Sequence, residues 1–139
     1  MSAPIVLGFD GSECSVAALK ETIAVAHALR APVVVCFAYY ISPLGGGDVR
    51  DYKAALEKVA EHETTRALAD LEDAGIEASV RHVQGKPAEG LLALASEVGA
   101  QMIVVGGLES HSVIERVLGS VVLNLVQRSP VPVLVVPSP

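Results

Sequence analysis

Two glycine-containing segments in the last third of the chain have the residue types that bind phosphate. Gly106 and Gly107 follow four apolar residues typical of a buried strand, 102–105, and Gly119 and Ser120 precede an apolar repeat of helical spacing. Glycine leaves backbone N–H groups uncovered, and a helix that begins near Ser120 adds further N–H groups and the positive end of its dipole. The alternative is that these glycines only form turns, because short glycine patterns often match by chance.

Asp10 is a second candidate, because it follows the first apolar run, residues 4–9, and precedes a helical pattern that begins near Ser12. At the end of a strand its carboxylate could accept a hydrogen bond from a ligand. Equally, it could end the strand and cap the helix. In a doubly wound sheet the ends of the first and fourth strands lie side by side, so Asp10 and Gly106 would face each other across one crevice.

Alternating strand and helix patterns would position these residues. Strands are expected at 4–9, 32–40, 76–83, 102–105 and 131–136, and helices at 12–29, 49–74, 87–98 and from about Ser120. The helix at 49–74 is expected to bury an apolar side that includes Val59. This alternation predicts an α/β fold, a three-layer α/β/α sandwich around a five-stranded, mainly parallel sheet.

Length and composition limit the classes of function. One domain over residues 1–139 is the default for this length, and 51% hydrophobic against 19% charged residues predicts a folded chain. The net charge of −6 disfavours nucleic acid and anionic membrane as partners. The two cysteines lack metal-ligand spacing, so no metal site is expected. The N-terminus lacks a signal-peptide pattern, so a cytoplasmic location is expected.

Three blocks of the chain, in this order, resemble the universal stress protein family over nearly the whole length. They are IVLGFDGSECSVAAL at the start, GKPAEGLLALASEVGAQMIVVGG in the middle and LGSVVLNLVQRSPVPVLVV at the end. The resemblance implies sheet order 3-2-1-4-5 and a homodimer paired through the last strand, from Val131 to Val136. A long apolar edge strand needs a cover, and a symmetric copy would supply one.

Nucleotide-binding members of this family carry a motif of Gly, two residues, Gly, nine residues, Gly, then Ser or Thr. On this chain the first glycine is Gly106, the third is Gly119 followed by Ser120, and the middle position holds Glu109. The resemblance implies ATP, with or without Mg²⁺, as the ligand. It implies contacts with Gly8, Phe9 and Asp10 beside the adenosine, Ala38 and Val105 at the base, and Gly106, Gly119, Ser120 and Val121 around ribose and phosphates.

Glu109 separates two possible functions. A non-glycine residue in a left-handed conformation costs roughly 1–2 kcal/mol, and a carboxylate about 4 Å from a phosphate oxygen costs on the order of 4 kcal/mol. If the carboxylate turns to solvent or coordinates Mg²⁺, the protein is an ATP-binding regulatory dimer of the stress response. If phosphate binding is lost, the dimer works through interaction or signalling.

Enzymatic alternatives lack their motifs. No GxGxxG follows the first strand, as a dehydrogenase needs, and no GK[ST] occurs, as a P-loop NTPase needs. No nucleophile with a general base is evident, so at most slow ATP hydrolysis is expected. The sequence leaves open whether the run from Gly45 to Gly47 forms a lid, and which adenine nucleotide is preferred, a cyclic nucleotide included.

Overall fold

The computed structural model describes residues 2–39, 49–108 and 119–137. Strands and helices alternate along these ranges: β1 (Ile5–Gly8), α1 (Glu13–Leu29), β2 (Val33–Tyr39), α2 (Val49–Asp73), β3 (Ala78–Gln84), α3 (Pro87–Val98), β4 (Met102–Leu108), α4 (Ser120–Arg128) and β5 (Val133–Pro137). The expected alternation is confirmed. The glycine run at 45–47 and Glu109 lie outside the described residues. None of the described helices is long and apolar enough to cross a membrane.

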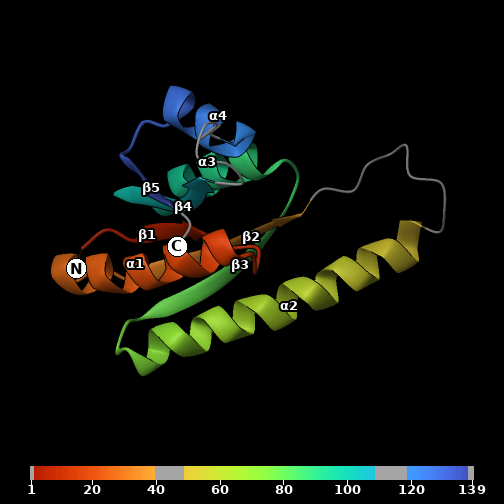
Figure 1. The fold of residues 1–139 in the computed structure, drawn as a ribbon, viewed down its shortest axis with the longest axis horizontal. Coiled ribbons are helices and arrows are strands. Elements are labelled where there is room, and N and C mark those ends of the chain that lie inside the picture. Colours follow the sequence, from red (N-terminus) through yellow and green to blue (C-terminus); the bar gives the residue numbers. More distant parts are fainter. Residues whose placement is uncertain (1, 40–48, 109–118, 138–139) are drawn as a thin grey trace.

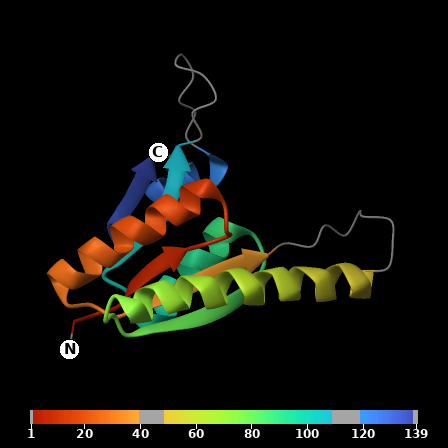
Figure 2. The same ribbon diagram turned by 60° about the horizontal axis from the view of Figure 1, so that its bottom comes forward.

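The strands form one parallel sheet in the order β3-β2-β1-β4-β5, as the resemblance implied. Ile5 is opposite Val33 on one side and Met102 on the other, so β1 lies at the centre of the sheet. Figure 2 shows β4 and β5 running side by side in the same direction. Because all strands are parallel, their carboxyl ends meet at one edge, and ligands of open α/β sheets bind at that edge.

Helices cover both faces of the sheet and produce two apolar cores. Alternate residues of β1 divide between them: Ile5 and Leu7 pack with α1 and α2, whereas Val6 packs with α3 and α4. Figure 1 shows α1 and α2 below the sheet and α3 and α4 above it. The three-layer α/β/α sandwich is therefore confirmed.

Local signals set several helix ends. Ser12 caps α1, and its hydroxyl accepts a hydrogen bond from the backbone N–H of Ser15 at 3.3 Å. Pro87 occupies the first turn of α3, where its missing N–H is no loss. Gly99 ends α3 with a φ of 64°, a left-handed conformation that glycine adopts without strain.

Most strand boundaries differ from the sequence expectation by one to three residues, and those of β4 and β5 lie nearest the site. β4 does not stop before Gly106 but continues to Leu108, because Gly106 pairs with Val136 of β5. β5 begins at Val133 rather than Val131. The hydroxyl of Ser129 holds a turn by donating to the carbonyl of Val131 at 2.7 Å and accepting from its N–H at 3.2 Å.

The buried side of α2 also differs from expectation. Val59 is exposed, whereas Leu71 of the predicted apolar side is buried together with the small residues Ala60, Thr64 and Ala67. These four residues recur at spacings of four, three and four along one helix face. The small residues among them let α2 pack close to the sheet, and the predicted apolar side missed this because it followed only the large residues.

Candidate functional site

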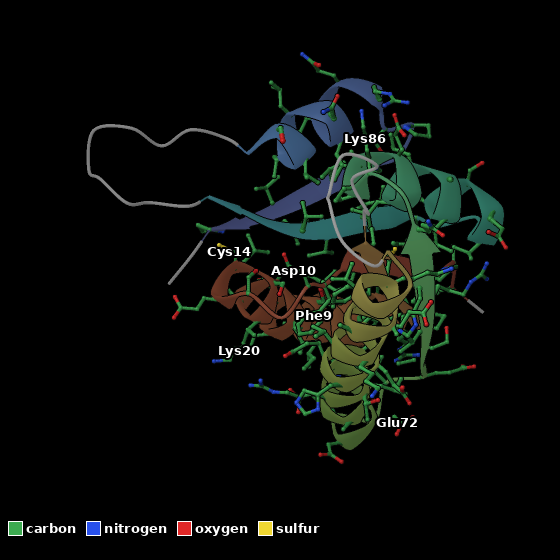
Figure 3. All side chains as sticks on the ribbon, turned by 90° about the vertical axis from the view of Figure 1, so that its right-hand side faces the viewer. Phe9, Asp10, Cys14, Lys20, Glu72 and Lys86 are labelled. Atoms are coloured by element: carbon green, nitrogen blue, oxygen red, sulfur yellow. The ribbon has the colours of Figure 1, made fainter. Side chains whose placement is uncertain are left out.

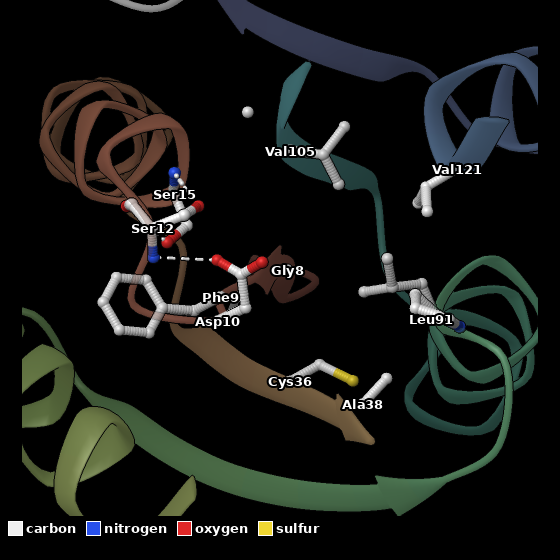
Figure 4. A pocket seen from close by; sticks show the side chains of 12 residues that line it. Gly8, Phe9, Asp10, Ser12, Ser15, Cys36, Ala38, Leu91, Val105 and Val121 are labelled. Atoms are coloured by element: carbon white, nitrogen blue, oxygen red, sulfur yellow. Dashed lines mark hydrogen bonds between the residues drawn. The ribbon is translucent and has the colours of Figure 1, made fainter. Parts of the chain in front are cut away.

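A cavity of about 170 Å³ opens at the carboxyl edge of the sheet, between β1 and β4. Residues from β1, β2, β4 and the starts of α1, α3 and α4 line it: Gly8, Phe9, Asp10, Ser12, Ser15, Cys36, Ala38, Pro87, Leu91, Val105, Gly106 and Val121. Figure 4 shows their side chains around the cavity. This position is the topological switch point of the sheet, since β1 has β2 on one side and β4 on the other.

Asp10 supplies the charge of the cavity. Its Oδ1 accepts a hydrogen bond from the backbone N–H of Ser12 at 2.9 Å, across the turn that leads into α1. Burial raises the pKa of Asp10, but hydrogen bonds from Ser12 and Ser15 lower it by more, so the pKa lies below its ordinary value of 3.8. Asp10 is therefore an anion at neutral pH, and it both orders the turn and lines the cavity.

The sequence left open whether Asp10 caps the helix or faces a ligand, and its position in the structure is compatible with both. The hydrogen bond to Ser12 is the structural role, and the position at the cavity is the one a ligand would meet. Figure 3 shows Phe9, Asp10 and Cys14 close together at the beginning of α1. Phe9 lines the cavity but is itself buried in the core against α1 and α2. Its backbone N–H donates to the carbonyl of Cys36 at 3.0 Å.

The opposite walls of the cavity are apolar. Leu91 of α3 and Val105 of β4 are buried, and Ala38 ends the wall that β2 contributes. Cys36 is also buried, and burial raises the pKa of its thiol to about 12. The thiol is therefore protonated at neutral pH and acts as a small apolar group, as expected from its place in the strand. Such walls suit a flat, weakly polar ring.

Two glycines of the site allow neighbouring parts of the protein to pack closely and are not needed for turns. A methyl group on Gly106 would collide with the backbone carbonyl of Cys14, so the glycine lets α1 pack directly on β4. A methyl group on Gly8 would lie 3.1 Å from Val105 Cγ1 and 3.2 Å from Leu91 Cδ1, between two walls of the cavity. Gly8 thus keeps space open in the cavity. Neither has the positive φ that a loop glycine often needs.

The start of α4 lies partly at the cavity. The helix begins at Ser120, as the sequence predicted. Gly119 is its N-cap, and both residues are exposed. Val121 lines the cavity, whereas Gly119 and Ser120 are not among the described residues that line it. Glu109, the residue in place of the central motif glycine, lies outside the described part of the chain.

Seven of the ten residues predicted for the site therefore meet at one cavity: Gly8, Phe9, Asp10, Ala38, Val105, Gly106 and Val121. Sequence reasoning missed Ser12, Ser15, Cys36, Pro87 and Leu91 as lining residues. Ser12 and Pro87 were identified as helix-start residues. Because a helix that follows a parallel strand starts at the carboxyl edge, those two assignments already placed them near the site.

Metal ligands do not gather in the described residues. Within residues 2–39, 49–108 and 119–137, no group of three or more His, Cys, Asp or Glu side chains could hold a metal ion. Asp10 is the only carboxylate among the described residues that line the cavity. Among the described lining residues, a cation that accompanies a ligand would therefore find one carboxylate, that of Asp10.

Comparison with known proteins identifies the family. The model of the universal stress protein family matches residues 1–137. A universal stress protein of Methanocaldococcus jannaschii is 27% identical, and the match covers 97% of this chain and 82% of that protein.

Two solved structures are similar over almost their whole length. A universal stress protein from Burkholderia pseudomallei has a TM-score of 0.82 and 25% identity, with coverage of 98% of this chain and 96% of that one. A universal stress protein solved in complex with cAMP has a TM-score of 0.72 and 30% identity, with coverage of 99% and 98%. This chain belongs to the universal stress protein family.

Proposed function

We propose that this protein binds an adenine nucleotide and acts as a regulatory homodimer of the cytoplasmic stress response. The observation that carries the proposal is the cavity at the switch point, where seven residues predicted from the sequence come together. The similar universal stress protein in complex with cAMP supports an adenine nucleotide as the class of ligand.

The lining fits the two halves of a nucleoside. The adenine ring would lie between the apolar side chains of Ala38, Leu91 and Val105. The sugar hydroxyls would donate to the ionised carboxylate of Asp10, which keeps a second oxygen beside the one that accepts from Ser12. The volume of about 170 Å³ is below the roughly 300 Å³ of the smallest typical ligand pockets. The described cavity would therefore enclose only part of the nucleoside, and the rest of the nucleotide would extend toward α4.

Phosphate would meet the start of α4. The first N–H groups of a helix have no partner within the helix, and the positive end of the dipole lies there. Gly119 and Ser120 are exposed at this end, and Val121 reaches the cavity. In the sequence, Glu109 stands where nucleotide-binding relatives have glycine, and it would oppose each additional phosphate charge.

Catalysis is not part of the proposal, beyond slow hydrolysis of ATP. The described lining offers hydroxyls on Ser12 and Ser15 and one carboxylate on Asp10, and the hydrogen bonds of all three lie within the turn that starts α1. Binding and release of the nucleotide, rather than its conversion, would then carry the signal.

The homodimer would pair through β5. This strand is at the edge of the sheet, and Val133, Leu134 and Val135 are only half-buried. A broad groove of about 1000 Å³ runs along it beside α1. Its lining combines the apolar Leu134 and Val136 with charges of both signs from α1 and α2, Lys20, Glu21 and Arg66 among them. An edge strand of this kind has free main-chain groups that a symmetric copy could pair with.

Calorimetric titration tests the ligand and the effect of Glu109 together. Wild-type protein, Glu109→Gln and Glu109→Gly would each be titrated with ATP, AMP and cAMP, with and without Mg²⁺. Gln removes the charge but keeps the side chain, whereas Gly also restores the backbone freedom of the motif. We expect AMP and cAMP to bind wild type, and ATP to bind Glu109→Gly up to about a thousandfold more tightly than wild type.

Three other results of the titration would change the proposal. Micromolar ATP binding by wild type only with Mg²⁺ would make Glu109 a neighbour of the metal. Silence of wild type toward all three nucleotides, with binding by Glu109→Gly, would favour the interaction or signalling dimer. No binding by any of the three proteins would show the proposed ligand class to be wrong.

A further inference from the structure

A second cavity, of about 300 Å³, lies at the amino edge of the sheet, opposite the edge that carries the proposed nucleotide site. Ser2, Pro32 and Glu77 line it, and they precede β1, β2 and β3 in turn. The C-terminal ends of α1 and α2 complete its walls, and Figure 2 shows both helix ends beside the N-terminus. The volume is at the lower limit, roughly 300 Å³, of typical pockets for small molecules.

Hydrogen bonds fix the shape of this cavity. The Nε2 of His27 on α1 lies 2.8 Å from the carbonyl oxygen of Ala74, just after α2. Because a carbonyl can only accept, Nε2 carries the proton and donates it, which ties the two helix ends together. The backbone N–H groups of Ala31 and Ile76 donate back into α1 and α2 at 3.1 Å and 3.0 Å, so the chain turns sharply after each helix.

The floor of the cavity is apolar. Ala26 is 2% exposed, Ala31 is 5% exposed and Ile76 is 7% exposed, and all three line the cavity. A ligand with a small hydrocarbon body would gain free energy by covering these side chains.

Arg30 lines the cavity in a backbone conformation that arginine rarely adopts. It ends α1 with a φ of 51°, whereas the same left-handed region is occupied by Gly75 after α2 and by Gly99 after α3. Among the described residues, Arg30 is the only one other than glycine with a positive φ. Strain of this kind is concentrated at ligand sites. Glycine would suit the backbone better, so the guanidinium is what this position gains.

The cavity carries unpaired charges of both signs. In the part of the chain that the structure describes, neither the Arg30 guanidinium nor the Glu77 carboxylate has an ion-pair or hydrogen-bond partner. A guanidinium binds a carboxylate through two parallel hydrogen bonds. The carboxylate of Glu77 and the negative dipole ends of α1 and α2 favour a cation instead. A simple anion or a simple cation would be repelled by one of these groups, whereas a ligand with both charges satisfies each.

We propose that this cavity binds a small zwitterion of the class of apolar α-amino acids. Its carboxylate would bind Arg30, its ammonium group would lie at Glu77, and its side chain would cover Ala26 and Ile76. The inference depends on neither the proposed nucleotide nor the proposed homodimer, because no residue that lines this cavity belongs to the nucleotide cavity or to β5.

Nuclear magnetic resonance titration of the ¹⁵N-labelled protein with three probes tests the ligand class. The probes are L-leucine, isocaproate, which lacks the ammonium group, and isoamylamine, which lacks the carboxylate. We expect leucine to bind about tenfold or more tightly than either, because each lost charged contact costs about that factor. The amide signals of Ala31, Gly75 and Ile76 should shift, whereas those of Gly8 and Gly106 at the nucleotide cavity should not.

Two variants test the charged partners. Arg30→Gly should weaken leucine binding by about tenfold or more, while its melting temperature stays unchanged or rises because glycine suits the left-handed conformation. The loss of binding could then not come from unfolding. Glu77→Gln should weaken leucine by a similar factor but should not weaken isocaproate. Glu72→Gln is the matched control and should bind leucine like wild type, because Glu72 is an exposed carboxylate of α2 that does not line the described cavity.

Three results would overturn the inference. Leucine could leave the amide signals of Ala31, Gly75 and Ile76 unshifted. A folded Arg30→Gly protein could bind leucine as tightly as wild type does. Isocaproate or isoamylamine could bind as tightly as leucine, which would show that the cavity does not select a zwitterion.

Discussion

At the scale of single residues, Asp10 connects local structure with the site. Its carboxylate accepts the Ser12 N–H, and the Ser12 hydroxyl in turn accepts the Ser15 N–H at the start of α1. The turn therefore holds Asp10 at the cavity before any ligand arrives. Such preorganisation reduces the entropy that a ligand must overcome when it orders its partner groups.

The lowered pKa of Asp10 predicts how its contribution to stability depends on pH. A carboxyl whose folded pKa lies below its unfolded value, here 3.8, stabilises the fold fully above that value and loses this contribution as pH falls through the folded pKa. Asp10→Asn should therefore lower the midpoint of urea unfolding by a constant amount between pH 5 and 7, because the wild-type carboxyl is ionised throughout this range. Below about pH 4 the gap from wild type should shrink.

Urea titrations of both proteins at several pH values measure this gap. Asp70→Asn is the control, because Asp70 is an exposed carboxylate on α2 far along the chain from the turn. A gap that stays constant down to pH 3, or that Asp70→Asn reproduces, would show that the charge of Asp10 is not what orders the turn.

At the scale of elements, β4 shows what sequence patterns could and could not predict. The apolar run 102–105 was sufficient to predict a buried strand. Its continuation through Gly106 and Gly107 was not predictable, because it depends on the distant residues that pack there. Cys14 of α1 packs on one glycine, and Val122 of α4 and Val135 of β5 pack on the other. The glycines identified as a phosphate loop therefore also serve helix and strand packing.

Gly107→Ala should destabilise the fold through this packing. Its methyl group would lie 2.5 Å from Val122 Cγ2 and 2.6 Å from Val135 Cγ1, and both valines have stiff side chains. We expect a loss of about 1–3 kcal/mol in the free energy of unfolding, measured by urea denaturation.

Gly119→Ala is the matched variant at the other motif position. No described residue lies within 4 Å of the added methyl group, and the φ of −58° suits alanine. Its free energy of unfolding should stay within about 1 kcal/mol of wild type, because a small cap preference opposes a small entropy gain. Equal losses at both positions would show that glycine flexibility, rather than packing at Gly107, controls this region.

At the scale of the whole molecule, the sequence predicted the layers, the alternation and most of the cavity. Asp10 and Gly106 could be placed together because parallel strands bring their ends to one edge. Leu91 and Cys36 could not be placed at the cavity, because their contact with it depends on how α3 crosses the sheet and on which face of β2 is turned inward. Val59 shows the same limit, since small residues around it decided which side of α2 is buried.

One helix joins the cavity to β5, the edge strand through which we propose that the homodimer pairs. α4 has only nine residues, with Val121 at the cavity, and it packs on β5. Gly107 lets it pack directly on the central layer, so a shift of α4 would affect β5 as well. A nucleotide and a second copy would then bias the position of the same rigid element. Two binding events that share such an element are thermodynamically coupled, and the coupling is reciprocal.

Saturating AMP should therefore tighten dimerisation, by a factor of about 5–150 if the coupling has the usual size. Sedimentation velocity with and without AMP gives this factor. Calorimetry gives the corresponding ratio of AMP affinities between concentrated, dimeric protein and dilute, monomeric protein. Each dimer binds two nucleotides. Because coupling is reciprocal, the factor by which saturating AMP lowers the dimer dissociation constant should equal the square of the factor by which dimerisation raises the AMP affinity of one site. If AMP binds but leaves the dimer dissociation constant unchanged, α4 does not couple the cavity to β5.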